Sequence, residues 1–412
     1  MTRNAASGTP DGNIVVMDGT VLHLLANLDR GGAQEVVRTL VAALPPTGWR
    51  PLVATFRDGP LRAEIEQTGI GVRVLPGRTR SVGAPLQALA EIGAIRRELA
   101  RVTRQDGVDV VQTHLLGSLD FVALAARAGD RQALLWTVHN AILDLRADQL
   151  PAGQRWLLSG KRAAYRFAYR LGGRLADGFV AVSDDVASAI TAAYRPPRER
   201  LFVIPNGVEM ARYASRDARA ATRADLGLAP DARLLIVVAK LFAQKGHAVL
   251  LDALGSVALR AGDVVLLVGE GPEREHLERV ARDRGLRAVR FAGNRPDVPA
   301  LLAASDLFVL PSLWEGLPMA LLEGMASGLP VVATDVAGSR QVVVPGESGV
   351  LVPPGDAPAL ASAINALLDD DGQRSRLAQG ARQRVKAEFS SARQAERHAA
   401  AYEAVQARRQ RR

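Results

Sequence analysis

Short apolar runs alternate with helical stretches along almost the whole chain. Continuous runs of Val, Leu and Ile, such as residues 233–239 and 263–269, are typical of strands buried on both faces of a sheet. Alternation of such strands with helices predicts parallel sheets built from βαβ units. The predicted strands are 21–25, 51–56, 72–76, 108–113, 134–138, 178–182 and 201–205 in the first half, and 233–239, 263–269, 289–293, 307–311 and 330–334 in the second.

The strand pattern stops at residues 206–231, which are rich in Ala and charge and predict a linker with a short helix. This segment divides the chain into two halves of similar size. We expect a disordered tail over 1–13, an N-terminal domain over 14–205, a C-terminal domain over 206–388 and a final helix over 389–412.

The composition excludes several classes of chemistry and of membrane attachment. The 412 residues include no cysteine, which excludes disulfides, thiolate catalysis and cysteine-bound metals. The polar N-terminus lacks the apolar segment of a signal peptide, and no apolar run has the length of a membrane span. We therefore expect a cytoplasmic protein that is soluble or peripheral on the membrane. No metal-binding motif occurs either, so no metal cofactor is expected.

The formal net charge of +9 predicts an anionic partner. Nucleic acid, an anionic lipid surface and phosphorylated small molecules all fit that charge. The excess of arginine is spread along the chain, and no basic–aromatic nucleic-acid module is present. We therefore expect no nucleic-acid partner.

The segment after strand 307–311 contains two acids in apolar surroundings, Glu315 and Glu323. Pro318 is a good first helical residue, which places Glu315 in the loop before a helix and Glu323 about one and a half turns inside it. Carboxylates accept hydrogen bonds from hydroxyl groups, whereas a helix start attracts anions. The pattern predicts a ligand with both, although an ordinary core helix fits an isolated pair of acids equally well. The expected donors are the N–H groups of Gly316, Leu317, Met319 and Ala320.

Two of the four lysines, Lys240 and Lys245, flank a turn after strand 233–239, just before Gly246. Two ammonium groups at a strand–helix junction suit a diphosphate, and a solvated basic loop is the plain alternative. The next strand ends in GEGPER, which has Arg274 where a dinucleotide-binding motif has its third glycine. The motif therefore does not favour a dinucleotide-dependent hydride transfer.

In the first half, Gly31 and Gly32 open a helix after strand 21–25 and allow a ligand to approach the backbone. His139 follows strand 134–138 and is the best candidate for handling a proton. His114 holds a similar place after its strand. His23 lies within a strand, where a core role is the simpler interpretation.

Taken in order, the motifs resemble those of a retaining glycosyltransferase of family 4. These motifs are GGAQ, TVHN, VAVSDDV, IPNGV, AKLFAQKG, VGEGPEREHLE, FAGNRPDVPALLAASDLFVLPS and E-x7-E. The resemblance covers nearly the whole chain. It implies the GT-B fold, an α/β architecture of two facing Rossmann-like domains with parallel sheets and an interdomain cleft. It also implies a UDP- or GDP-sugar donor, retention at the anomeric carbon and no metal.

The resemblance assigns roles by position. Glu323 would bind the nucleotide ribose, and Glu315 would lie near the donor sugar and phosphates. Lys240, where the family more often has arginine, and Lys245 would clamp the diphosphate. The catalytic set would be Glu315, His139 and Lys245. The donor-binding set would be Gly32, Lys240, Lys245, Asn294, Arg295, Glu315, Gly316, Leu317, Met319 and Glu323.

The acceptor would be a glycan or a lipid-linked molecule, read by the N-terminal half. A stripe of arginines there, with Tyr165, Phe167 and Tyr169 interleaved, predicts either an anionic membrane contact or, more simply, a solvated helix face. The stripe consists of Arg162, Arg166, Arg170 and Arg174. Two other functions stay open, a GT-B-like sugar-nucleotide epimerase and a non-catalytic nucleotide-sugar-binding protein.

Overall fold

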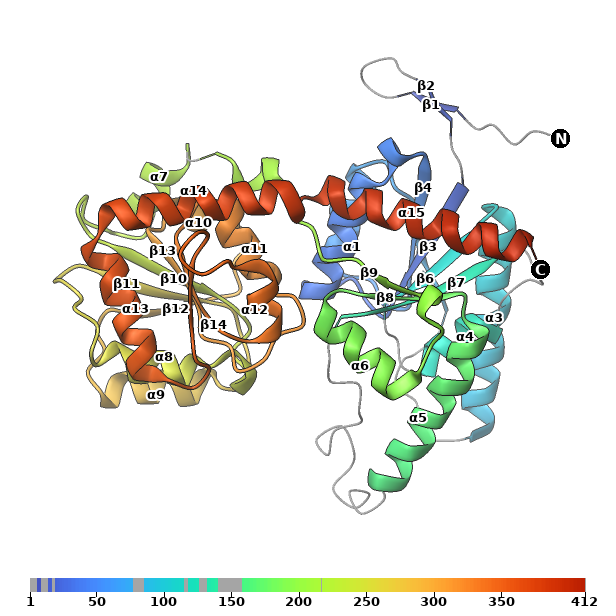
Figure 1. Cartoon of the computed structure of the whole chain (residues 1–412), viewed down its shortest axis with the longest axis horizontal. Helices are drawn as coiled ribbons and strands as arrows, with labels where there is room; N and C mark the ends of the chain where they lie inside the picture. The colour runs from blue at the N-terminus through green and yellow to red at the C-terminus, as the bar shows by residue number, and fades with distance from the viewer. Residues whose placement is uncertain are drawn as a thin grey trace. The chain divides into compact units, whose positions relative to one another are not determined.

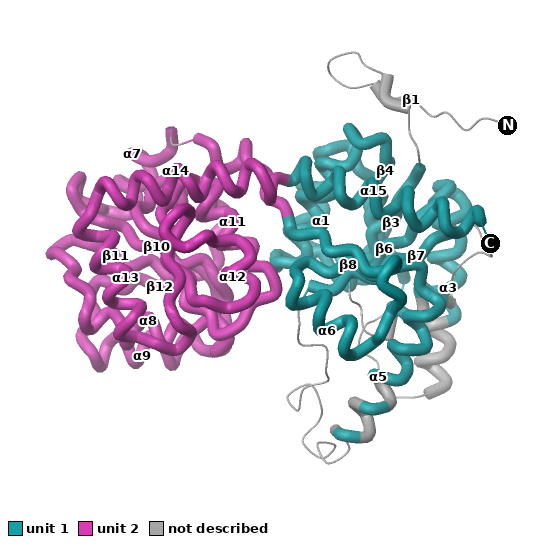
Figure 2. Tube along the Cα trace, viewed as in Figure 1, with its two compact units in different colours: residues 1–206, 391–412 teal, residues 207–390 magenta. Residues whose placement is uncertain are grey.

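The computed structural model divides into two compact units (Figure 2). Unit 1 comprises Met1–Asn206 with Ser391–Arg412, and unit 2 comprises Gly207–Ser390. Each unit is built on a parallel sheet with helices, so the predicted α/β fold with two Rossmann-like domains is confirmed. The structure describes residues 6–8, 14–16, 19–76, 85–114, 118–125, 132–139, 158–215 and 217–411.

The sheet of unit 1 has seven parallel strands in the order β5-β4-β3-β6-β7-β8-β9. In chain order, β4 and β5 are added on one side of β3, and β6 to β9 are added on its other side. The strand order therefore reverses between β3 and β6. Ligands of such sheets bind at this reversal, at the carboxyl ends of the strands. The strands are β3 Gly19–Leu25, β4 Trp49–Thr55, β5 Val72–Val74, β6 Val110–Thr113, β7 Ala133–Val138, β8 Gly178–Ala181 and β9 Leu201–Val203.

Helices connect and cover these strands (Figure 1). They are α1 Gly32–Ala43, α2 Leu61–Gln67, α3 Pro85–Gln105, α4 Ser118–Ala125, α5 Leu158–Leu175, α6 Asp184–Tyr194 and α15 Ser391–Gln410, with short 3₁₀ turns at Pro45–Thr47 and Arg198–Arg200.

The N-terminal residues include two short strands where the sequence predicted a disordered tail through residue 13. Ala6–Gly8 (β1) pairs antiparallel with Ile14–Val16 (β2), with Ala6 opposite Val16. The β-branched residues of β2 favour an extended backbone, and antiparallel strands exchange backbone hydrogen bonds in both directions.

The last helix, α15, packs on the sheet of unit 1. Tyr402 is fully buried, and its ring meets that of Trp49 edge to face at 4.8 Å between centroids. The Tyr402 hydroxyl donates to Gln112 in β6, and Arg409 forms an ion pair of 2.9 Å with Asp177. The C-terminal helix is thus part of the core of unit 1, although 184 residues of unit 2 precede it.

The sheet of unit 2 has six parallel strands in the order β12-β11-β10-β13-β14-β15, with its reversal between β10 and β13. All five predicted strands are present. The sixth, β15, was not predicted; it has only three residues between glycine- and proline-rich turns, and pairing with β14 defines it. The strands are β10 Leu234–Val238, β11 Val264–Val268, β12 Val289–Gly293, β13 Leu307–Leu310, β14 Val331–Thr334 and β15 Val350–Val352.

The helices of unit 2 cover the sheet (Figure 1), and an apolar core on one of its faces gathers alternate strand residues such as Leu235, Val265 and Leu307. They are α7 Arg219–Asp225, α8 His247–Leu254, α9 Arg274–Asp283, α10 Val298–Ala304, α11 Met319–Ala326, α12 Ala337–Val342, α13 Ala357–Asp369 and α14 Asp371–Glu388, with 3₁₀ turns at Met210–Tyr213 and Ala243–Lys245.

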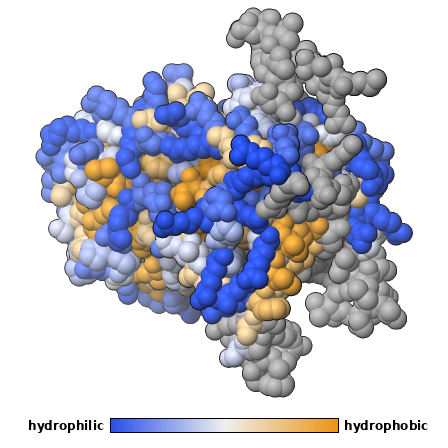
Figure 3. Space-filling model, turned by 45° about the vertical axis from the view of Figure 1, so that its right-hand side comes forward, coloured by the Kyte–Doolittle hydropathy of each residue, from blue (hydrophilic) through white to orange (hydrophobic). Residues whose placement is uncertain are grey.

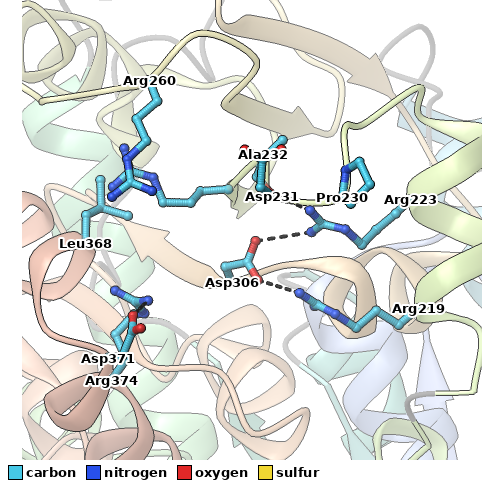
Figure 4. Close-up of a pocket in the computed structure, with 11 residues that line it drawn as sticks. Arg219, Arg223, Pro230, Asp231, Ala232, Arg260, Asp306, Leu368, Asp371 and Arg374 are labelled. Atoms are coloured by element: carbon cyan, nitrogen blue, oxygen red, sulfur yellow. Dashed lines mark hydrogen bonds and ion pairs between the residues drawn. The ribbon is translucent and has the colours of Figure 1, made fainter.

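Ion pairs attach the predicted linker, residues 206–231, to the rest of unit 2. From α7, Arg219 and Arg223 both bind the carboxylate of Asp306, just before β13 (Figure 4). The same guanidinium groups also donate to the carbonyls of Ala303 and Ala304 at the end of α10. Two of the charged residues of this segment therefore hold it against the end of α10 and the start of β13.

A cavity of about 280 Å³ lies beside this network and is lined by five arginines (Figure 4). It opens at the amino ends of the strands, the edge opposite to that which binds ligands in such sheets. Arg233 is paired with Asp263 and Arg374 with Asp371, while Arg219 and Arg223 share Asp306. These charges hold loops and helix ends in place, so the cavity has a structural explanation.

Candidate functional site

The loops that follow β10 and β13 are joined at the sheet reversal of unit 2. The backbone N–H of Leu313 donates to the carbonyl of Gln244 at 2.7 Å, and the Gln244 side chain donates to the carbonyl of Trp314 at 2.8 Å. Gly246 completes the contact with φ of +65°, and a Cβ atom there would lie 1.9 Å from the carbonyl oxygen of Pro311. Only glycine permits this approach.

Joining these loops brings Lys245 to Glu315. The Lys245 Nζ lies 2.6 Å from Glu315 Oε1, and the hydroxyl of Ser312 donates to the same oxygen at 2.7 Å. The Glu315 side chain is buried, whereas that of Lys245 is 22% exposed. Buried carboxylates require such partners. The acid thus holds the ammonium group at the ligand-binding edge of the sheet, and Ser312 is a member of the site that the sequence motifs did not single out.

The glycines of GEGPER have a packing role at the same edge. A Cβ atom on Gly269 would lie 2.1 Å from the carbonyl oxygen of Ala239, and one on Gly271 would lie 2.2 Å from that of Leu241. The backbone N–H of Leu241 also donates to the carbonyl of Glu270 at 2.9 Å. These glycines let the β11 loop approach the β10 loop that carries the lysines.

Helix α11 begins at Met319, and Pro318 takes the extended N-cap position rather than the predicted first helical position. Glu323 is then the fifth residue of α11 and is half-buried. A Cβ atom on Gly338 in α12 would lie 2.6 Å from the carbonyl oxygen of Gly316. Helix α12 therefore packs directly on the loop between Glu315 and α11 and limits its movement.

Three further candidates lie at this edge with exposed side chains. Lys240 follows β10, and no ion pair to it occurs in the part of the chain that the structure describes. Asn294 and Arg295 follow β12. Arg295 donates to Asp297 at 2.7 and 2.6 Å, and this hydrogen bonding lowers the pKa of Asp297. The structure thus pairs Lys245 with Glu315 and leaves these three side chains on the surface.

In unit 1, Gly32 is the exposed first residue of α1, after the reversal strand β3. No described atom of the chain lies within 4 Å of the place where a Cβ atom would stand. Packing within this unit therefore does not require glycine at position 32.

His139 belongs to a row of three imidazoles in unit 1. Nδ1 of His23 lies 3.1 Å from Nε2 of His114, and Nδ1 of His114 lies 3.1 Å from Nε2 of His139. His23, interpreted from the sequence as a core residue, is fully buried and is also bonded within this row. Burial lowers the pKa of His23 to about 3 and that of His139 to about 4, so the rings are neutral at pH 7.

Among the described residues, no helix combines the length and apolar character needed to cross a membrane. Likewise, within the ranges given above, no group of three or more His, Asp or Glu side chains is placed to hold a metal ion.

Comparisons with known proteins match both halves of the chain. Residues 30–212 match the model of Glycosyltransferase Family 4, and residues 218–384 match that of Glycosyl transferases group 1. The D-inositol 3-phosphate glycosyltransferase of Corynebacterium urealyticum is 29% identical over 378 residues, which cover 86% of each chain. A UDP-Gal:alpha-D-GlcNAc-diphosphoundecaprenol alpha-1,3-galactosyltransferase of Escherichia coli is 28% identical over 66% of this chain and 69% of its own.

Among solved structures, Anabaena Alr3699/HepE in complex with UDP-glucose is similar with a TM-score of 0.76 and 25% identity. The match covers 93% of this chain and 98% of the Anabaena chain.

Proposed function

The chain belongs to the group 1 glycosyltransferases of family 4, and from this premise we propose that it moves a sugar from a UDP- or GDP-sugar to a glycan or lipid-linked acceptor. The product would be a cell-surface polysaccharide or glycolipid. One observation carries the proposal: the Lys245–Glu315 pair stands at the reversal of the unit 2 sheet, where nucleotides bind in this class of fold. The similarity to a UDP-glucose complex and to a transferase with a diphosphoundecaprenol acceptor supports the choice of substrates.

The proposed chemistry follows from charge. Breaking the bond between sugar and phosphate develops negative charge on the leaving diphosphate. The Lys245 ammonium group, held in place by Glu315, and the N–H groups at the start of α11 are fixed donors for that charge. These groups supply the positive charge that a metal ion would otherwise provide, which is why we propose a metal-independent reaction.

Retention follows if the acceptor attacks from the face that the diphosphate leaves. The bond from the anomeric carbon to the phosphate oxygen breaks, and the bond to the acceptor oxygen forms. The acceptor proton passes to the departing phosphate, so that no side chain has to act as a nucleophile. Neutral His139 fits this scheme as a hydrogen-bonding group for the sugar, since its pKa of about 4 makes it a weak base.

The other donor contacts are proposed by position. Glu323 accepts from the ribose hydroxyls, Asn294 and Arg295 lie by the base, and Lys240 joins Lys245 at the diphosphate. In unit 1, Gly32 leaves room for the phosphate or sugar to approach the start of α1. The backbone of Gly316, Leu317 and Met319 completes the anion site.

The function is tested by thermal denaturation against a panel of nucleotide sugars in the presence of a chelator. A UDP- or GDP-sugar at 100 times its Kd should stabilise the fold by about 2.7 kcal/mol. Glu323→Ala should reduce the shift, whereas Glu403→Ala, the same change on the exposed side of α15, should leave it intact. The absence of a shift with every nucleotide sugar would contradict the proposal.

We further propose that α5 docks unit 1 on the anionic cytoplasmic leaflet and brings the enzyme to lipid-linked acceptors. Phe167, Leu171 and Leu175 are exposed by 69%, 53% and 56%, at a spacing that lines them along one side of the helix. Hydrophobic surface borders hydrophilic surface on the face shown in Figure 3. The exposed arginines at positions 166, 170 and 174 form the adjacent stripe. We call these six residues the α5 ridge.

One residue that the sequence interleaved with the arginine stripe, Tyr169, has another position. Tyr169 is buried in the core of unit 1, where its hydroxyl donates to Asp120 at 2.8 Å and its ring contacts Trp136. It therefore anchors α5 from beneath and has no membrane role. The side chains of Tyr165 and Arg162 lie outside the described residues.

Sedimentation with vesicles tests this docking. Arg166→Glu with Arg174→Glu should weaken binding to anionic vesicles at least tenfold, since each basic residue near such a surface contributes about 1 kcal/mol. Arg170 is left unchanged because its Nε donates to the carbonyl of Ala193. The control is Arg279→Glu with Arg282→Glu, which makes the same change of charge at two exposed positions of α9. Equal binding to neutral vesicles, or binding that survives the ridge variant, would overturn the docking proposal.

A further inference from the structure

The three-histidine row of unit 1 joins neighbouring strands. His23 lies in β3 opposite Gln112 of β6, and His114 stands two residues beyond Gln112, so both rings project from the same face of the sheet. His139 follows β7, the next strand. The ring centroids are 5.4 Å apart in both steps. The row runs from the fully buried His23 to the half-buried His139.

Proton counting restricts this row to two states. A neutral imidazole has one N–H and one bare nitrogen, and each ring–ring hydrogen bond needs one of each. His114 uses both of its nitrogens, so it must donate to one neighbour and accept from the other. Either all three rings are protonated on Nδ1 or all three on Nε2. Any mixed set brings two N–H groups or two lone pairs face to face at 3.1 Å.

Among the described residues, the polar neighbours of the row are Gln112, Thr137, Tyr402 and His398, and no hydrogen bond from them to the three rings selects either state. Beside it, the Gln112 amide donates to Thr137 at 2.7 Å and accepts from Tyr402. These groups therefore have partners of their own. Nε2 of His23, at the buried end, has no hydrogen-bond partner among the described residues. The two states therefore differ chiefly at the opposite end, on Nδ1 of His139.

We propose that the three rings change tautomer together and that His114 is a positioning residue, which fixes the ring of His139 through Nε2 and decides whether its other nitrogen, Nδ1, carries the proton. In one state His139 donates through Nδ1, and in the other it accepts there. The row can thus pair with a phosphate oxygen or with a sugar hydroxyl without acquiring a charge. The contact with the sugar rests on the proposed function, whereas the shared tautomer does not.

The shared tautomer is tested by NMR on the full chain labelled with ¹⁵N-histidine, without any nucleotide sugar. Two-bond ¹⁵N–¹H correlations distinguish protonated from bare ring nitrogens, and single substitutions assign the signals. We expect His23, His114 and His139 to show the same protonated nitrogen, while exposed His276 of α9 serves as the reference for free solution. A mixed set of tautomers, or a charged ring at pH 7, would overturn the inference even if the protein proves to be an active transferase.

Substitution of His114 tests the positioning role. His114→Leu should release His139, so that its tautomer no longer follows that of His23 and becomes a mixture like that of His276, while kcat falls about tenfold with little change in KM. His114→Gln carries one donor and one acceptor and should restore a single tautomer at His139. A His139 signal unchanged in His114→Leu would refute the role. The measurement on the unsubstituted chain stands even if this variant does not fold.

Discussion

Replacing Lys245 by alanine is expected to lower kcat by roughly 10²- to 10³-fold, the usual cost of losing one fixed donor to a developing negative charge. In the structure, the ammonium group lies 2.6 Å from the buried carboxylate of Glu315, and loops joined by backbone hydrogen bonds hold both. The donor is thus placed before substrate arrives. The rate is measured with the nucleotide sugar that gives the largest thermal shift.

Matched variants separate this effect from loss of charge in general. Lys386→Ala removes an exposed lysine on α14 and should leave kcat unchanged. Glu315→Gln should also lower kcat, because the lysine loses its ionised partner. The loss of transition-state stabilisation in the double variant should be no larger than about the sum of the losses in the two single variants. Full activity of Lys245→Ala with a native circular dichroism spectrum would remove the lysine from the mechanism.

Replacing Gly246 by alanine is expected to destabilise unit 2 by about 2–5 kcal/mol. The left-handed backbone costs a residue with a Cβ atom about 1–2 kcal/mol. Overpacking against the carbonyl of Pro311, 1.9 Å away, adds about 1–3 kcal/mol because that contact is backbone and yields poorly. The same displacement would move Lys245 away from Glu315. Urea denaturation followed by circular dichroism measures the first effect, and kcat measures the second.

Gly285→Ala is the matched control for this substitution. Gly285 has the same φ of +65°, and no described atom lies within 4 Å of its missing Cβ atom. It should therefore show the cost of the left-handed backbone alone, with kcat preserved. If the two variants were equally stable and equally active, the close approach of the two loops would have no part in the site.

The members of the proposed donor site in unit 2 were chosen from local pattern. The motifs that follow β10 and β13 contain Lys245 and Glu315, and strand-end positions in a parallel sheet indicate a common edge. The partner of Glu315 could not be predicted, because the lysine and the acid are 70 residues apart. The same limit applied to Tyr169 and Phe167, which differ in burial because α5 turns one toward Trp136 and the other outward.

The sequence by itself determined the parallel-strand architecture of both units, because short continuous apolar runs that alternate with helical stretches are typical of strands covered on both faces. It also determined which loops carry acids, lysines and glycines. Only the tertiary structure decided that Glu315 takes Lys245 as its partner and that His23, His114 and His139 form one row. The physical reason is that crossover connections bring the carboxyl ends of distant strands together, and hydrogen bonds of about 3 Å depend on that placement rather than on neighbours in the chain.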